Sequence, residues 1–158
     1  MSILEQIPFT KQGYQTLKEE LARLKKVERP ENIKAIETAR AHGDLSENAE
    51  YHAAKERQSF LEGRIGEISY KLGVAKIIDP ESVPKDIVRF ASRVLVENLD
   101  SEEQMEYMIV GPDEADIKEG RISVSSPLGS ALIGKRPGDE ATLQAPGGKR
   151  TYEIIDIL

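Results

Sequence analysis

The stretch AKERQSFLEGRIGEISYKLGVA, residues 54–75, spaces apolar and small side chains in alternating steps of four and three. The positions in this rhythm are Ala54, Gln58, Leu61, Ile65, Ile68, Leu72 and Ala75. Such spacing places one stripe of side chains along one side of a helix, as the seam of a coiled coil requires. It therefore predicts one long coiled-coil helix.

A second segment, upstream of this helix, has the same rhythm. Its seam positions are Tyr14, Leu17, Leu21 and Leu24, and the pattern resumes out of phase at Ile33 and Ile36. Pro30 stands between the two phases, and a proline inside a helix removes one N–H donor and clashes with the preceding turn. We therefore expect a kink or restart of the helix at Pro30, or a stutter in the seam.

The two helical segments are joined at His42-Gly43-Asp44. A connection this short favours two antiparallel helices packed as a hairpin. Each arm would have roughly 30 residues and reach about 45 Å, at about 1.5 Å per residue. Such length is typical of a probe or clamp that reaches into a partner. A dimerisation coiled coil has the same periodicity, so the pattern alone leaves both interpretations open.

The second half has short segments that are rich in β-branched residues and separated by turn signals. These segments are SRVLVENL, MEYMIV, RISVSS, EATLQA and TYEIIDIL, with APGGKR as a hairpin turn. Among them, SPLGSALIGK predicts one short helix with Ser126 as N-cap, Pro127 at its first position and Gly134 at its end. The sequence thus predicts an α+β fold, with a coiled-coil hairpin over residues 1–78 and a small antiparallel sheet with one short helix over residues 79–158.

Charge is distributed unevenly between these halves. Of the 22 Lys/Arg and 28 Asp/Glu residues, residues 1–78 hold 13 and 12, whereas residues 79–158 hold 9 and 16. Binding to a phosphate backbone depends on Lys and Arg that displace counterions, so any nucleic-acid contact is expected in the first half. Cysteine is absent, which excludes disulfides and thiolate metal sites. Since neither a signal peptide nor a long apolar run is present, we expect a soluble cytoplasmic protein without a membrane partner.

An acidic run, ARAHGDLSENAEYHAAKE at residues 39–56, lies where the two helices meet. Asp44, Glu47 and Glu50 have no Lys or Arg three or four residues further along the chain, where a helix would bring an offsetting charge. Arg40 lies close by, four residues before Asp44, and could reach across to it. The acids therefore need another explanation than pairing along one helix.

Two explanations of the acids remain open. In one, Gly43 ends the first helix, Asp44 caps the second and Glu47 completes a capping box, or Ser46 caps instead. In the other, Asp44 and Glu47, three residues apart on one helical face, bind Mg²⁺. This ion prefers carboxylate oxygen and needs only one or two protein carboxylates when a partner supplies the remaining ligands.

The motif AHGDLSENAEYHAAKE closely resembles the acidic tip of the bacterial transcript-cleavage factors of the Gre family, in particular the GreA branch. The resemblance continues through ERQSFLEGRI and ISVSSPLGSALIGK to APGG, so it covers nearly the whole chain. It implies an N-terminal antiparallel coiled coil followed by a C-terminal FKBP-like domain.

The resemblance also implies a transcription elongation factor that is not itself an enzyme. Such a protein binds backtracked RNA polymerase, inserts its coiled coil into the secondary channel and stimulates the polymerase's own cleavage of nascent RNA. Carried over by motif position, Asp44 and Glu47 are the catalytic tip acids, which hold Mg²⁺ jointly with the polymerase and orient the attacking water. No metal is expected on the free protein, and no small-molecule substrate. The intact tip acids favour the cleavage-stimulating class over inhibitory variants.

Two sets of contact residues follow from the same resemblance. Lys55 and Arg57, with Tyr51, match the region that contacts the displaced RNA 3′ segment; the alternatives are a solvated helix face for the cations and packing near the tip for the tyrosine. The segment that grips the rim helices of the largest polymerase subunit is matched by Ser125, Ser126, Pro127 and Leu128. A helix cap with its core anchor is the alternative there.

The rim-binding segment departs from the family pattern. Many relatives carry a basic residue after the Ser-Pro pair, whereas this chain has Leu128-Gly129-Ser130. The departure leaves the strength of docking to the rim open. The acidic tip has no comparable change.

Two other classes of protein remain compatible with the sequence. A coiled-coil adaptor would use the hairpin without chemistry, and its acids would be helix caps. A peptidyl-prolyl isomerase is suggested by the FKBP-like assignment, but the strand region is poor in the aromatic side chains that build a proline pocket. Its aromatic residues are Phe90, Tyr107 and Tyr152.

Overall fold

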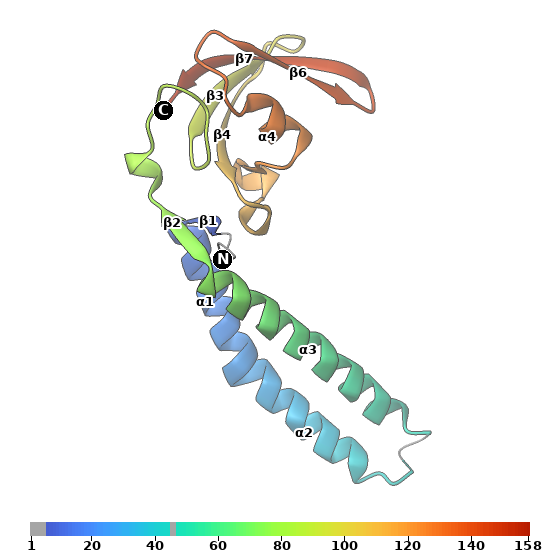
Figure 1. Cartoon of the computed structure of the whole chain (residues 1–158). Coiled ribbons are helices and arrows are strands. Elements are labelled where there is room, and N and C mark those ends of the chain that lie inside the picture. The colour runs from blue at the N-terminus through green and yellow to red at the C-terminus, as the bar shows by residue number, and fades with distance from the viewer. Residues whose placement is uncertain (1–5, 45–46) are drawn as a thin grey trace, which may run out of the picture. The chain divides into compact units, whose positions relative to one another are not determined.

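The computed structural model describes residues 6–44 and 47–158 of the chain. It is an α+β structure with an N-terminal helical hairpin and a C-terminal curled sheet (Figure 1). Two compact units are present. Residues 14–75 with Ile7 form the hairpin unit, and residues 8–13 with 76–158 form the sheet unit. Within the described ranges, no helix combines the length and the apolar character needed to cross a membrane.

The hairpin unit has two helical arms. The first arm runs through α1 (Lys11–Arg23), a π-helical turn (Leu24–Glu28) and α2 (Arg29–Arg40), and the second arm is α3 (Ala49–Gly73). Contacts between the arms pair early residues of one with late residues of the other, as in Glu20 with Arg64 and Asn32 with Ala54. The arms are therefore antiparallel.

The predicted seam of the second arm is buried. Its most buried side chains, none more than 6% exposed, are Ala54, Leu61, Ile65 and Ile68. In the first arm the prediction is wrong at Ile33, which is 46% exposed, and Asn32, 4% exposed, occupies the seam instead. The Asn32 Nδ2 donates a hydrogen bond of 2.9 Å to the carbonyl of Ala54. A polar group buried with one partner in this way favours a single register of the two helices.

Pro30 lies inside the first arm without ending it. The preceding turn is π-helical, and the N–H of Arg29 donates to the carbonyl of Leu24, five residues back. A π-helical turn inserts one residue and accommodates the hydrogen bond that a proline cannot make. The inserted residue rotates all following side chains, so the buried positions after Leu24 are one residue later than an unbroken α-helix would place them. An unbroken helix would continue the seam from Leu24 to position 31, seven residues on. The insertion moves this seam position to Asn32, which faces the other arm, whereas Ile33 is exposed.

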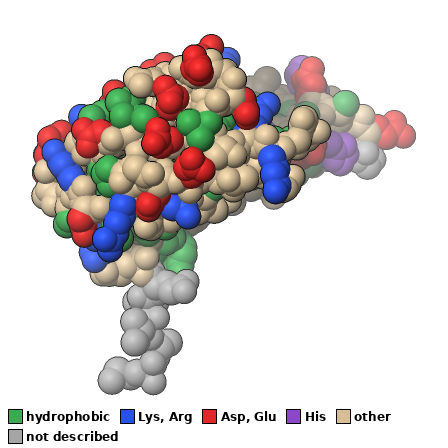
Figure 2. Space-filling view, turned by 90° about the horizontal axis from the view of Figure 1, so that it is seen from above, with side chains coloured by type: hydrophobic (Ala, Val, Ile, Leu, Met, Phe, Trp, Pro, Cys, Tyr) green, Lys and Arg blue, Asp and Glu red, His purple; other side chains and the backbone are tan. Residues whose placement is uncertain are grey.

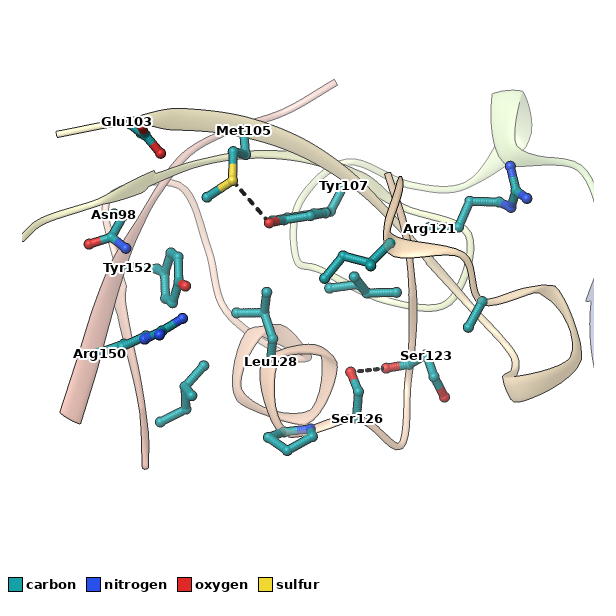
Figure 3. A pocket seen from close by; sticks show the side chains of 15 residues that line it. Asn98, Glu103, Met105, Tyr107, Arg121, Ser123, Ser126, Leu128, Arg150 and Tyr152 are labelled. Atoms are coloured by element: carbon teal, nitrogen blue, oxygen red, sulfur yellow. Dashed lines mark hydrogen bonds between the residues drawn. The ribbon is translucent and has the colours of Figure 1, made fainter. Parts of the chain in front are cut away.

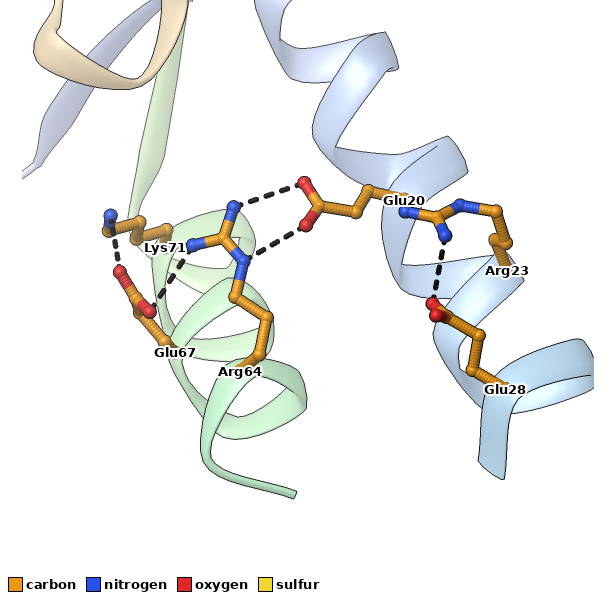
Figure 4. Close-up of polar contacts among 6 residues, drawn as sticks. All are labelled: Glu20, Arg23, Glu28, Arg64, Glu67 and Lys71. Carbon is orange, nitrogen blue, oxygen red and sulfur yellow. Dashed lines mark hydrogen bonds and ion pairs between the residues drawn. The ribbon is translucent and has the colours of Figure 1, made fainter. Parts of the chain in front are cut away.

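Ion pairs join the two arms. Arg64 donates two hydrogen bonds to the carboxylate of Glu20, at 2.9 and 3.0 Å, and lies 3.2 Å from Glu67 (Figure 4). Lys71 also contacts Glu67, at 3.0 Å. The hydrogen bond to Glu20 raises the pKa of Arg64, and the bonds from Lys71 and then Arg64 lower the pKa of Glu67. Such pairs contribute little free energy, but the Glu20–Arg64 pair joins the arms and so favours this antiparallel register, whereas the pairs of Glu67 lie within α3.

The sheet unit contains five strands in the order β5-β4-β3-β7-β6. Their bounds are β3 (Arg93–Asn98), β4 (Gln104–Val110), β5 (Arg121–Ser123), β6 (Glu140–Ala145) and β7 (Gly148–Ile157). Each one overlaps a strand predicted from the sequence. The prediction of a purely antiparallel sheet is wrong, because β5 pairs with β4 in parallel. The connection 111–120 carries the chain across, so that β5 runs in the same direction as β4.

A separate two-stranded sheet was not predicted. It pairs β1 (Ile7–Thr10) with β2 (Ala75–Ile78). The two strands are far apart in the sequence, and each is only four residues long. Such short segments give no period from which pairing could be inferred.

The predicted short helix is α4 (Pro127–Leu132). Ser126 is its N-cap, and Gly134 follows the helix with a φ of 81°, in the left-handed region that glycine favours. Helix α4 anchors on the core of the sheet unit. Fully buried side chains of this core are Val88, Val94, Val96, Ile109, Leu132 and Ile154.

Candidate functional site

The acidic tip lies in the loop between the two arms. Helix α2 ends at Arg40 and α3 begins at Ala49, so the connection is residues 41–48 rather than the three residues expected. Gly43 has a φ of 108°, a backbone conformation that favours glycine. Asp44 and Glu47 are both exposed and both precede the helix. The expectation that these two acids share one helical face is therefore wrong.

Asn48, not Asp44, caps α3. Its Oδ1 accepts the N–H of Tyr51 at 3.0 Å. With the cap at Asn48, the third helical position is Tyr51, so Asp44 and Glu47 do not form the predicted capping box. The alternative cap, Ser46, lies outside the described residues. Asn is as good an N-cap as Asp or Ser, and the sequence signal for it was the Asn directly before the helical pattern resumes.

Glu50 has a partner that spacing along one helix did not reveal. Its Oε2 lies 3.6 Å from Nε2 of His42, across the loop. Both side chains are mostly exposed, at 76% and 61%. Solvent screens such a pair, so its contribution is small. The contact links the start of the loop, at His42, to the first turn of α3, where Glu50 lies.

The aromatic residue of the tip is partly covered. The guanidinium carbon of Arg40 lies 5.9 Å from the centre of the Tyr51 ring, within cation–π range. The ring of His52 approaches the same tyrosine edge-on, with the ring centres 5.8 Å apart. These contacts support the packing interpretation of Tyr51, and its contact with RNA stays a prediction.

The two predicted RNA-contacting cations have different surroundings. Arg57 donates a hydrogen bond of 2.9 Å to Glu28 in the other arm, and Glu28 also accepts one from Arg23 at 2.8 Å. Lys55 contacts Gln58, three residues on along the same helix, at 2.9 Å. Arg57 is thus part of the links between the arms, whereas the described contact of Lys55 is local to its own helix. Neither observation tests a role in RNA binding.

The described tip residues fit only part of a metal site. Within residues 6–44 and 47–158, no group of three or more His, Cys, Asp or Glu side chains is arranged to hold a metal ion. Asp44 and Glu47 supply oxygen ligands of the type that Mg²⁺ prefers. Two carboxylates are enough for this ion only when another molecule and water complete its shell. The donor set therefore fits a shared site.

A second candidate site is a pocket in the sheet unit, of about 620 Å³ (Figure 3). Tyr107 and Tyr152 lie on its wall, and the Tyr107 hydroxyl donates to Sδ of Met105 at 3.1 Å. Burial raises the pKa of Tyr107. Three of the four predicted rim-binding residues also line the pocket: Ser126, Pro127 and Leu128. The pocket is thus continuous with the segment that the sequence predicts to bind the polymerase.

The fourth of these residues, Ser125, is exposed and lies beside the pocket. Its Oγ is 2.8 Å from that of Ser123. Ser126 donates to the carbonyl of Ser123 at 2.7 Å and accepts the N–H of Gly129 at 3.0 Å. A Cβ on Gly129 would lie 2.0 Å from that same carbonyl oxygen, so only glycine fits there. Leu128 is half-buried and contributes an apolar side chain to the wall of the pocket.

The face of the sheet unit shown in Figure 2 does not resemble a nucleic-acid interface. On the face shown in Figure 2, acidic and basic side chains are interspersed without a continuous basic patch. This agrees with the acidic balance of residues 79–158, which hold 16 Asp/Glu and 9 Lys/Arg. The sheet unit is therefore better suited to a protein partner than to a phosphate backbone.

Comparison with known proteins gives matches over nearly the whole chain. The family model described as "Transcription elongation factor, N-terminal" matches residues 7–77, and that described as "Transcription elongation factor, GreA/GreB, C-term" matches residues 83–158. The chain is 57% identical to transcription elongation factor GreA of Thermodesulfovibrio yellowstonii, over 97% of both chains. It is 56% identical to GreA of Neisseria meningitidis serogroup A, over 98% of both.

Solved structures with similar chains were also found. The GreA factor homolog 1 (Gfh1) protein of Thermus thermophilus is 30% identical, with a TM-score of 0.45, over 98% of this chain and 99% of that one. A GreA/GreB elongation factor from Nitrosomonas europaea is 23% identical, with a TM-score of 0.42, over 97% of this chain and 98% of that one.

Proposed function

Since the chain belongs to the GreA/GreB family of transcription elongation factors, we propose that it binds backtracked RNA polymerase and stimulates the polymerase's own cleavage of nascent RNA. Family membership confirms the resemblance drawn from the tip motif. In this proposal the protein is not itself a nuclease. It acts in the cytoplasm, where a bacterial polymerase works, and its partners are the polymerase and the 3′ segment of the RNA.

The two units have separate tasks in this proposal. The hairpin, acting as a coiled coil, enters the secondary channel with its tip towards the polymerase active centre. Helix α3 alone has 25 residues, which corresponds to about 38 Å of reach. The sheet unit, as an FKBP-like domain, docks on the rim helices of the largest subunit. The proposal needs both a reaching element and a docking element.

One observation carries the proposal: both tip acids are exposed in the loop at the end of the hairpin. Asp44 and Glu47 lie ahead of the first turn of α3, so their carboxylates do not serve as its N-cap. In the adaptor alternative, the acids exist to cap the helix, and that task belongs to Asn48. The exposed acids therefore favour a role that involves a partner.

In the complex, Asp44 and Glu47 would hold Mg²⁺ together with ligands of the polymerase. When bound there, the ion supplies a more acidic water and neutralises charge on the leaving oxygen. The carboxylate oxygens of the two acids accept hydrogen bonds from water and so orient it toward the RNA phosphate. Their negative charge is tolerated on the free protein because solvent screens it.

Docking would use Ser125, Ser126, Pro127 and Leu128. Pro127 and Leu128 present apolar surface beside the pocket, and Ser126 is held rigid by its two hydrogen bonds. An apolar surface on a rigid turn suits a helical partner surface. For the RNA 3′ segment, Lys55 is the better placed of the two cations, because Arg57 already pairs with Glu28.

The test uses arrested elongation complexes supplied with Mg²⁺. Asp44→Asn with Glu47→Gln should lower RNA shortening on the order of 100-fold, because it removes the charges but keeps the shape. Binding to polymerase should persist. Glu56→Gln is the matched control, because it neutralises an exposed acid within α3, away from the tip loop. It should stimulate RNA cleavage as the wild type does. Equal loss of binding and cleavage in the double variant would contradict the proposed role of the tip.

A further inference from the structure

One side chain at the tip bonds to the ends of both arms. The Oδ1 of Asn48 accepts the N–H of Tyr51 in the first turn of α3, at 3.0 Å. Its Nδ2 donates to the carbonyl of Ala39 in the last turn of α2, at 2.7 Å. Both partners are backbone groups that a helix terminus leaves without a bond inside the helix. Asn48 therefore connects the two arms through their backbones, independently of which side chains surround it.

The bond to Ala39 lies in a partly buried position. Ala39 is 2% exposed, and its carbonyl also accepts the N–H of His42 at 3.1 Å. A hydrogen bond shielded from solvent is stronger than an exposed one. The contact between His42 and Glu50 across the tip is weaker by comparison, since this pair is 3.6 Å apart and mostly exposed.

In the sequence, both tip acids lie between Ala39 and Asn48, the two residues that this hydrogen bond joins. Glu47 directly precedes Asn48, and Asp44 follows the turn at Gly43 that ends the first arm. Holding Ala39 and Asn48 together fixes the two ends of the loop that contains both acids. Without this link, the ends would be free to separate, and the two carboxylates would sample more relative positions.

We propose that Asn48 is a positioning residue, which holds the ends of the tip loop together so that Asp44 and Glu47 can act on one ion. This inference rests on the proposed function, because it concerns the same reaction. The cap and the link are separable. A cap needs only the Oδ1 acceptor, whereas the link between the arms needs the Nδ2 donor.

Two substitutions separate the cap from the link. Asn48→Asp keeps the size and the cap acceptor but replaces the donor with an oxygen that repels the Ala39 carbonyl. Asn48→Ser keeps a capping oxygen without added charge, and it is too short to carry the donor to Ala39. Asp, Ser and Asn are comparable N-caps, so both variants should keep the cap, and their melting temperatures should fall by no more than about 2–4 °C, the effect of one lost hydrogen bond.

The experiment measures RNA cleavage in arrested complexes, at saturating factor and over a series of Mg²⁺ concentrations. Both variants should lose about tenfold in cleavage rate, because small misplacements of reacting groups are costly. They should need more Mg²⁺ for half-maximal rate, while their affinity for polymerase is unchanged. A helix that has only lost stability would not change the Mg²⁺ requirement at saturating factor.

Wild type and the double variant Asp44→Asn with Glu47→Gln are measured in parallel. If the wild type fails to stimulate cleavage, the proposed function fails, irrespective of Asn48. If the wild type cleaves and both Asn48 variants match it, the positioning role is overturned. It is also overturned if only Asn48→Asp is impaired, because that result assigns the effect to added charge, or if the loss comes with weaker binding to polymerase or leaves the Mg²⁺ requirement unchanged.

Discussion

The hairpin unit and the sheet unit hold their functional residues by opposite means. At the hairpin tip, exposed acids lie in a loop held by hydrogen bonds between helix ends. In the sheet unit, Gly129 comes directly after the segment 126–128, and its backbone lies so close to the Ser123 carbonyl that no side chain fits there. The tip can therefore change its chemistry with little effect on the fold, whereas the docking segment cannot change without disturbing its unit.

This contrast has a physical origin. The hairpin is stabilised by one apolar seam that repeats along its length, and its tip lies beyond the end of that seam. The docking segment 125–128 instead includes the N-cap and first turn of α4, whose Leu132 is fully buried in the core of the sheet unit. Changes in the seam and in α4 should therefore be costly, and changes on exposed helix faces should be small.

The largest loss is expected from Ile68→Ala in the hairpin seam. Ile68 is 0% exposed, so the substitution removes buried apolar area and leaves a cavity. The free energy of unfolding should fall by about 3 kcal/mol. Phe60→Ala is the control on the same helix, because Phe60 is 68% exposed, and it should change stability by less than about 0.5 kcal/mol. Denaturant unfolding followed by helical circular dichroism measures both. Similar losses for the two variants would contradict the assigned seam.

Gly129→Ala should produce the next largest loss, in the sheet unit. The new Cβ would lie 2.0 Å from the Ser123 carbonyl oxygen, so the backbone of α4 has to shift. We expect a loss of about 2 kcal/mol in the free energy of unfolding. Hydrogen exchange should show faster exchange in β5 and α4, and binding to polymerase should weaken. A variant as stable as the wild type would show that the segment adapts more readily than its packing indicates.

The sequence predicted the periodic parts of both units and missed what depends on single residues. Steps of four and three located the α3 seam, and β-branched segments located all five strands of the larger sheet. The exchange of Ile33 for Asn32 was missed, because hydrophobicity favours Ile33 and Pro30 signals an interruption of the seam without giving its size. The parallel pairing of β5 and the short β1–β2 sheet were missed because they depend on the path of the chain.

At the tip, the sequence predicted which acids stand out but not how the loop holds them. Asp44 and Glu47 were identified by the motif, and their exposure agrees with that prediction. Asn48 was overlooked because Asp44 and Ser46 are equally good caps by residue type. The choice among them depends on which residue can also reach the Ala39 carbonyl, and that requires the position of the other arm.

Gly66→Ala should have a smaller effect, and of the opposite sign to Gly129→Ala. Gly66 lies on the exposed side of α3, and a Cβ there would meet nothing within 4 Å. Replacing glycine by alanine in an open helical position stabilises a helix by roughly 0.5–1 kcal/mol. The same substitution thus tests both units. Destabilisation by Gly66→Ala, measured by denaturant unfolding, would indicate that this face of α3 is not open.

The smallest effect is expected on lowering the pH around Glu67. Its bonds with Lys71 and Arg64 lower its pKa in the folded state below the ordinary value of 4.5. The folded protein therefore binds this proton less tightly than the unfolded chain does, so the stabilisation is fully present above pH 4.5 and is lost as the pH falls through the lowered pKa. Glu67→Gln should flatten the fall in melting temperature over that acidic range. Glu56→Gln should leave the fall unchanged, because no ion pair of Glu56 is present in the described part of the chain. If both variants follow the wild type, the pairs of Glu67 within α3 add no measurable stability, and the difference between the two units then rests on apolar packing.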